Sequence, residues 1–296
     1  MPSQVLTILN QPSADAPAHV PGAAPFRFAD AASPQLSMLD LGVTRGDGIF
    51  ESISVGNGRA QAFDHHLSRF AQSAARLDLP APDLEVWREA IVATIDALDD
   101  AEESFIRAVL TRGIEGDGRP SGWAFGSHSP DFTRERTEGI RVVLLDRGYR
   151  HDIQRTSPWL LAGAKTLSYA VNRAVVREAE RRGADDVIFV SSDGIVLDGP
   201  TSTLVFRRGN TLVTPHTDVG ILEGTTQANV FRFAETQGLS TEYEVVTPES
   251  LQGADAAWLV SSVRLSVPIC ELDGTPLAVD ADLSAAMNSY LRNLRD

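Results

Sequence analysis

The sequence is almost without lysine and almost without cysteine. Lys165 is the one lysine among 26 Lys and Arg residues, and Cys270 is the one cysteine. A single cysteine excludes an internal disulfide framework and a thiolate zinc site, and the six histidines show no metal-ligand spacing. The formal net charge of −14 argues against a nucleic-acid partner, and no apolar run is long enough to be a signal peptide or to span a membrane. We therefore expect a cytoplasmic protein with no metal ion, no nucleic-acid partner and no membrane partner.

The length and the apolar content predict two domains of mixed α+β structure. A chain of 296 residues with 43% hydrophobic residues is long for one core. We place an N-terminal α+β domain at 1–150, with an extended arm over the first 36 residues or so. A linker follows at 151–158, and a C-terminal α/β domain at 159–296 carries the lysine.

Periodicity predicts the main elements of both domains. Alternating apolar residues around a Gly-Asn-Gly turn indicate a hairpin at 46–63, and helical spacing indicates helices at 64–80, 83–98, 170–182 and 228–237. Strands are expected at 104–113, 140–147 and 256–274, and further hairpins at 186–199 and 202–215. The Gly- and Ser-rich stretch 114–138 is expected to be a loop that helps to cover a substrate pocket.

The solitary lysine is the first candidate for chemistry. Arginine stays protonated at any ordinary pH, whereas a desolvated lysine can lose its proton and act as a nucleophile. The apolar run 159–164 leads directly into Lys165 and favours a partly buried amine. The alternative is a residual lysine in a chain that prefers arginine, and uniqueness alone does not decide between the two.

Other residues match what an aldehyde cofactor with a phosphate group would need. Thr225 and Thr226 stand at the start of a predicted helix, where backbone N–H groups and hydroxyls bind anions, and Arg69 could add charge. Asp198 could bind a pyridine nitrogen, and Tyr169 a phenolic oxygen. Each residue also has an ordinary explanation: a helix N-cap, a solvated arginine, a turn-forming aspartate and a core tyrosine.

The order of the motifs resembles one enzyme family. The segments RGDGIFES, HLSRF, TRG, KTLSYAVNR, GADDVIFV, LDGPTST and GILEGTTQ resemble the class IV (fold type IV) pyridoxal-phosphate enzymes from about Gly42 to Gly274. This family contains branched-chain and D-amino acid aminotransferases and aminodeoxychorismate lyase. The resemblance implies the two-domain fold of the D-amino acid aminotransferases, pyridoxal 5'-phosphate as cofactor, a small-molecule amino substrate and a homodimer.

The resemblance also implies roles for individual residues. Lys165 matches the Schiff-base lysine, which arginine could not replace. The residues that match cofactor-binding positions of the family are Arg69, Lys165, Tyr169, Asp198, Thr203, Thr225, Thr226 and Ser262. The family usually has glutamate in place of Asp198 and asparagine in place of Thr203, and Gln227 stands where arginine is common.

The choice among the family's activities depends on less specific residues. The candidates for substrate binding are Phe50, Arg107, Arg112 and Arg264, although each arginine could instead form a surface ion pair. Glu51 is typical of many transaminases, whereas some lyases have threonine there. The sequences of 157–172 and 198–203 are most similar to those of actinobacterial-type aminodeoxychorismate lyases. We therefore expect the lyase first, a branched-chain or D-amino acid transaminase second, and a catalytically silent homologue third.

Overall fold

A computed structural model describes residues 2–294 and divides them by their contacts into two compact units. The first unit contains the described residues up to Pro130, together with Ala164–Tyr169 and residues 293–294. The second contains Asp131–Gly163 and Ala170–Arg292. Both units combine helices with a sheet, so the predicted mixed fold class is confirmed.

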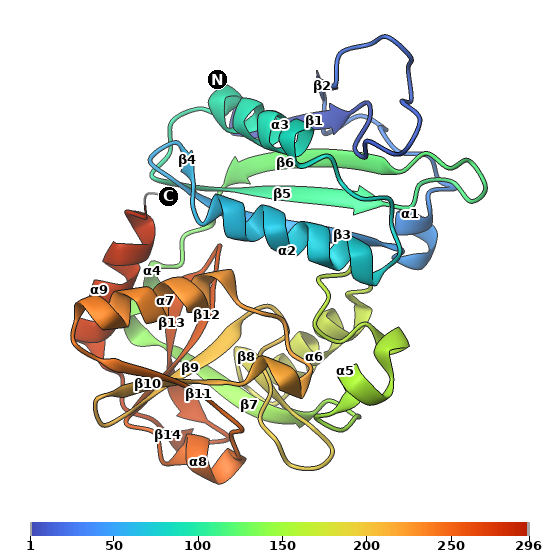
Figure 1. Cartoon of the computed structure of the whole chain (residues 1–296). Coiled ribbons are helices and arrows are strands. Elements are labelled where there is room, and N and C mark those ends of the chain that lie inside the picture. The colour runs from blue at the N-terminus through green and yellow to red at the C-terminus, as the bar shows by residue number, and fades with distance from the viewer. Residues whose placement is uncertain (1, 295–296) are drawn as a thin grey trace. The chain divides into compact units, whose positions relative to one another are not determined.

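The first unit is a six-stranded antiparallel sheet with the order β2-β1-β6-β5-β3-β4. Its elements are β1 (Gln4–Leu9), β2 (Phe26–Ala29), α1 (Leu41–Arg45), β3 (Gly48–Gly56), β4 (Arg59–Ala60), α2 (Phe63–Arg76), α3 (Leu84–Ala97), β5 (Glu103–Thr111) and β6 (Ser121–His128). Figure 1 shows α2 and α3 on the same side of this sheet. The helices bury apolar residues at helical spacing, among them Leu67 and Phe70 on α2 and Trp87 on α3.

Strand β6 corrects the prediction of a covering loop at 114–138. It pairs with β1 on one side and with β5 on the other, inside the sheet. Gly122 and Gly126 suggested a loop, yet both are required by close packing. A Cβ at Gly122 would lie 2.6 Å from Pro12 and 3.0 Å from Trp87, and one at Gly126 would lie 3.0 Å from Leu98. The glycines let α3 and the N-terminal segment pack closely against the strand.

The N-terminal segment is also more ordered than the predicted arm. Strand β1 pairs with β6 along its whole length, and Val5, Leu6 and Leu9 are buried. The sequence pattern QVLTIL contains this strand, but its Pro- and Ala-rich continuation concealed it.

The second unit is built on an eight-stranded mixed sheet. Seven strands follow the order β11-β10-β9-β12-β13-β7-β8, and the eighth, β14, pairs with β13. Its strands are β7 (Ile140–Asp146), β8 (Asp186–Val190), β9 (Thr203–Arg208), β10 (Thr211–Pro215), β11 (Ser240–Glu244), β12 (Ala256–Ser261), β13 (Leu265–Leu272) and β14 (Thr275–Pro276). Its helices are α4 (Thr133–Glu138), α5 (Ile153–Thr156), α6 (Ala170–Arg181), α7 (Thr225–Thr236), α8 (Pro248–Gln252) and α9 (Ala281–Arg292), with short 3-10 turns at Pro158–Leu160 and Thr217–Val219.

The two faces of this sheet form separate apolar clusters. Ile188 and Leu259 belong to the cluster on one face, which also contains Leu251 of α8. Val187 and Phe189, the neighbours of Ile188, pack instead with Ala179 of α6 on the other face. The period of two along β8 therefore separates the clusters.

The structure differs from the predicted domain boundaries in two places. Strand β7 was placed in the N-terminal domain, but it pairs in parallel with β8 and β13 of the second sheet. Lys165 was placed in the C-terminal domain, but Ala164–Tyr169 clusters with the first unit. Helix α9 was not predicted at all; its Ser284 hydroxyl accepts a 2.7 Å hydrogen bond from the buried Trp258 indole.

Among residues 2–294, no helix is both long and apolar enough to cross a membrane.

Candidate active site

The backbone around Lys165 is fixed on the free side of β3. The Lys165 carbonyl accepts a 3.0 Å hydrogen bond from the Phe50 amide, and the Leu167 amide donates to the Gly48 carbonyl at 2.8 Å. Thr166 lies opposite Ile49 in an antiparallel bridge. The Lys165 amide donates to the Ser73 hydroxyl of α2 at 3.2 Å. Strand-like pairing and a helix contact together set the position from which the amine extends.

The side chain of Lys165 lies against the Phe50 ring and is half-buried. Its Nζ lies 4.6 Å from the centroid of the Phe50 ring. Phe50 in turn meets Tyr169 edge to face at 5.3 Å between centroids. The structure thus brings together Lys165, Tyr169 and Phe50, three of the residues selected from the sequence.

A buried polar cluster of Glu51, His66 and Arg69 lies on the helix-covered side of β3. The Glu51 carboxylate accepts from Arg69 through Nε and Nη2, each at 2.7 Å, and from His66 Nδ1 at 2.7 Å. Only 1% of the surface of Glu51 and of His66 is exposed, and 9% of that of Arg69. Sequence analysis missed this cluster, although His66 and Arg69 stand three residues apart on one helix face.

Burial and charge shift both titratable groups of this cluster. Burial alone would raise the pKa of Glu51, but Arg69 and His66 hold that pKa well below its usual range. Burial is also the main cause that lowers the pKa of His66; Arg69 and Lys165 lower it further, and Glu51 opposes them. The carboxylate is therefore ionised and the imidazole neutral at neutral pH.

Arg107 lies on the sheet face opposite to the helices. It stands across from Ser52 in the register of β3 and β5, two residues from Phe50, so Arg107 and Phe50 share this face. The arginine is exposed, and its guanidinium lies 5.7 Å from the Phe105 ring centroid.

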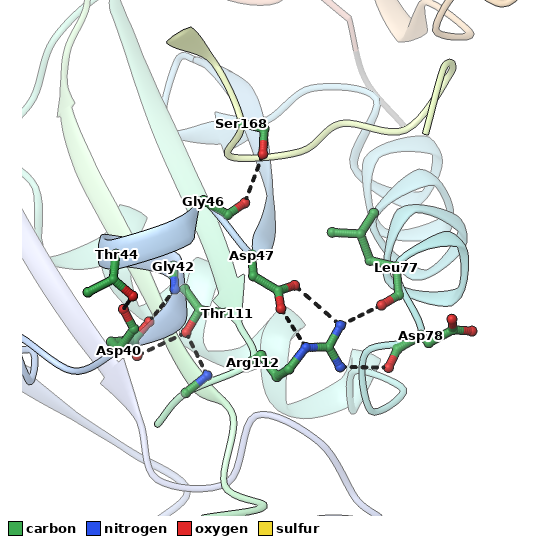
Figure 2. Close-up of polar contacts among 11 residues, drawn as sticks. Asp40, Gly42, Thr44, Gly46, Asp47, Leu77, Asp78, Thr111, Arg112 and Ser168 are labelled. Carbon is green, nitrogen blue, oxygen red and sulfur yellow. Dashed lines mark hydrogen bonds and ion pairs between the residues drawn. The ribbon is translucent and has the colours of Figure 1, made fainter. Parts of the chain in front are cut away.

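Arg112 is directed toward the end of α2 (Figure 2). Its Nε and Nη2 donate to the Asp47 carboxylate at 2.6 and 3.2 Å. Nη1 donates to the Asp78 carbonyl at 3.0 Å, and Nη2 donates to the Leu77 carbonyl at 2.6 Å. Four hydrogen bonds thus join the end of α2 to the residue that precedes β3.

In the second unit, Arg264 likewise has a structural partner. Its Nη2 lies 2.5 Å from Asp186 at the start of β8. The carbonyl of Arg264 accepts from the buried Arg136 at 2.9 Å, and that of Val263 accepts from Arg136 at 3.3 Å. These contacts hold the turn between β12 and β13, which begins at Ser262.

The first turn of α7 gathers polar groups around a helix N-terminus. Gly224 occupies the N-cap, and no side chain caps the helix there. The Thr226 hydroxyl lies 3.3 Å from that of Ser262, and Thr225 and Thr226 are buried. A Cβ on Gly224 would lie 2.4 Å from the Thr203 hydroxyl. A helix N-terminus with hydroxyls in the same turn is compatible with a phosphate group.

The turn that contains Asp198 and Ser202 adds further polar groups. The Asp198 carbonyl accepts from the Phe189 amide at 2.9 Å, which continues the pairing of β8. The Ser202 hydroxyl is buried and has no hydrogen-bond partner within the described part of the chain. Asn172 at the start of α6 donates to the Pro200 carbonyl at 2.6 Å and holds this turn. A buried hydroxyl without a partner, in the turn that also carries the half-buried Asp198, is compatible with a polar ligand.

The described residues contain no group of three or more His, Cys, Asp or Glu side chains that could hold a metal ion.

Comparisons with known proteins agree with this arrangement. The family described as "Amino-transferase class IV" matches residues 48–272, more than half of the chain. A bifunctional aminodeoxychorismate lyase / D-amino acid transaminase from Mycobacterium tuberculosis is 43% identical, over 83% of this chain and 90% of that protein. A fold IV transaminase from Curtobacterium pusillum has 53% identity and a TM-score of 0.94, over 99% of this chain and all of that one.

A hypothetical aminotransferase from M. tuberculosis in its PLP-bound form has 38% identity and a TM-score of 0.84, over 90% of this chain and 96% of that one. The similarity extends over both units. The chain belongs to the class IV aminotransferases, enzymes of fold type IV that use pyridoxal 5'-phosphate.

Proposed function

We propose that this enzyme is an aminodeoxychorismate lyase, which forms 4-aminobenzoate and pyruvate, and that it is also a D-amino acid transaminase. The observation that carries the proposal is the 43% identity to the M. tuberculosis relative, whose name gives both activities. The transaminase is retained as the second activity because the C. pusillum relative is a transaminase and because Glu51 is typical of transaminases.

Lys165 is the proposed catalytic residue. When bound, pyridoxal phosphate supplies an aldehyde that condenses with amines and a ring that accepts electrons. Lys165 Nζ would hold the cofactor through its aldehyde. The same amine, once released, would accept and return the proton of the substrate carbon next to the nitrogen. The fixed backbone of 165–167 and the half-buried side chain support this role, because they present one amine in one place.

The proposed phosphate ligands are hydroxyls and N–H groups of α7 and its neighbours, together with one arginine. They are Thr203, Thr225, Thr226, Ser262 and Arg69. The uncapped helix start supports the assignment, because it offers the N–H groups that a phosphate needs. We further propose that Asp198 binds the ring nitrogen and that Tyr169 donates a hydrogen bond to the phenolic oxygen.

Arg107 is the best candidate to bind a substrate carboxylate. Arg112 and Arg264 already bind carboxylates of the chain itself, whereas Arg107 is exposed on the same sheet face as Phe50. Phe50 lies over the Lys165 amine and is proposed to contact the apolar part of the substrate. We also propose a cytoplasmic homodimer, in line with the family resemblance; a lone free cysteine suits a reducing compartment.

Absorption and product assays test the proposal. The purified enzyme with pyridoxal phosphate receives aminodeoxychorismate in one cuvette and D- or L-amino acids in others, all without a keto acid. A lyase forms 4-aminobenzoate over many turnovers while its yellow band persists. A transaminase loses the band once with an amino acid and recovers it only when a keto acid is added. Lys165→Ala should give no yellow band with either substrate, and a colourless wild type would favour a catalytically silent homologue.

A further inference from the structure

The cluster of Glu51, His66 and Arg69 has a function that the proposed mechanism does not yet use. We propose that Glu51 is a positioning residue, which holds the guanidinium of Arg69 in one orientation for the cofactor's phosphate, and that His66 holds Glu51 in turn. This inference rests on the proposed function, in which Arg69 binds the phosphate. It adds two residues that bind neither the cofactor nor the substrate.

The two-point contact fixes the plane of the guanidinium. Arg69 donates to Glu51 through Nε and through Nη2, at 2.7 Å each. A single contact would leave the guanidinium plane free to rotate about the Cδ–Nε bond, whereas a fork held at both positions cannot rotate. Glu51 itself extends from β3, a strand paired along its whole length with β5. The sheet therefore determines which way the arginine points.

His66 completes the restraint from α2. Its Nδ1 lies 2.7 Å from Glu51 Oε2, the oxygen that also accepts from Arg69 Nη2. An ionised carboxylate only accepts hydrogen bonds, so Nδ1 carries the proton. Three charged groups influence the pKa of the imidazole: Glu51 from β3, Arg69 from its own helix and Lys165 from the segment beside β3. With His66 neutral, the charges of Glu51 and Arg69 cancel within the cluster.

A purely structural role is the alternative to be distinguished. Glu51 could serve only to join β3 to α2, and its loss would then weaken every ligand equally through a loosened fold. A positioning role instead affects ligands that carry a phosphate. Pyridoxal has the same aldehyde and ring as the cofactor but no phosphate, so the ratio of the two affinities separates the explanations.

The test compares apoenzyme variants by titration with pyridoxal phosphate and with pyridoxal, followed by visible absorption. Glu51→Gln should weaken binding of pyridoxal phosphate at least about tenfold and change that of pyridoxal by less than about twofold, because only the phosphate contact is disturbed. The 31P resonance of the bound phosphate should shift as well. Asp64→Asn is the matched control, since Asp64 lies on the same helix in an exposed ion pair with Arg88 and should leave both affinities unchanged.

A second pair of variants keeps the test decisive if Glu51→Gln does not fold. His66→Asn retains an N–H donor for Glu51, so the affinity for pyridoxal phosphate divided by that for pyridoxal should stay as in the wild type. His66→Leu removes the donor and should lower this ratio. Equal losses for both aldehydes, or equal ratios in the two His66 variants, would overturn the inference. A wild type that forms no yellow adduct with pyridoxal phosphate would instead contradict the proposed function.

Discussion

Replacing Arg112 by alanine should destabilise the first unit without changing substrate binding. The arginine donates four hydrogen bonds, two to Asp47 and two to the carbonyls of Leu77 and Asp78 at the end of α2 (Figure 2). These carbonyls lie where a helix leaves acceptors without partners, and where its dipole favours a cation. The contacts therefore join α2 to the start of β3, and their loss should lower the free energy of unfolding.

The magnitude follows from the number of contacts and from their exposure. A buried hydrogen bond to a charged group contributes about 1.5 kcal/mol or more, and an exposed ion pair less than about 1 kcal/mol. The side chains of Arg112 and Asp47 are 36% and 30% exposed, so solvent screens their ion pair considerably. We expect Arg112→Ala to lower the free energy of unfolding by about 2 kcal/mol in all. Arg112→Lys should lose about half as much, because an ammonium cannot reach both groups.

Urea unfolding of the apoprotein and steady-state kinetics together provide the assay. The fluorescence midpoint should fall in Arg112→Ala while KM for the amino substrate stays within about twofold. Arg155→Ala is the control, since Arg155 is 84% exposed and lies 3.9 Å from its acidic partner. An unchanged midpoint with a tenfold higher KM would refute this reasoning and would assign Arg112 to the substrate carboxylate.

Three further results are expected. The pKa of His66 is lowered in the folded chain, so near pH 6.5 the unfolded chain binds a proton that the folded chain does not. The free energy of unfolding should therefore fall below that pH, by up to about 1.4 kcal/mol per pH unit. His66→Asn should remove this part of the slope in acid unfolding curves. Gly224→Ala places a methyl 2.4 Å from a threonine hydroxyl on β9 and should weaken binding of pyridoxal phosphate about tenfold by absorbance titration; Gly253→Ala, whose nearest contact is 3.6 Å, should not. Trp258→Phe removes the buried indole donor to Ser284 and should cost about 2–3 kcal/mol in thermal unfolding, and a loss below 0.5 kcal/mol would contradict the importance of this bond.

Elements with a clear period could be predicted from the sequence. The hairpin of β3 and β4 and the helices α2, α3, α6 and α7 lie close to their expected ranges, because each presents one apolar face. Strand β6 could not be recognised, since its two glycines exist to admit α3 and not to form a turn. Strand β7 was recognised as a strand, but its partners β8 and β13 lie far along the chain. The local sequence therefore could not show to which of the two units it belongs.

The candidate site was predictable where a residue is unusual in itself. Lys165 stood out because no other lysine exists, and Thr225 and Thr226 because they open a helix. Glu51 and His66 were not selected, because their importance depends on a contact between a strand and a helix 15 residues apart. An acidic residue within the apolar strand pattern of β3, followed by a histidine and an arginine on one helix face, is the signal that would have found them.

The short segment that carries Lys165 has a consequence for the order of folding. Gly163 and Ala170 belong to the second unit, whereas Ala164–Tyr169 completes the first, and the bond from Lys165 to Ser73 joins residues 92 positions apart. Contacts so distant in sequence form late, because the intervening loop must close first. As the chain leaves the ribosome, the sheet of the first unit can assemble before the lysine has been synthesised. The Lys165 segment then adds to the edge of a strand that already exists, so the residue proposed to bind the cofactor is placed after its scaffold and not together with it.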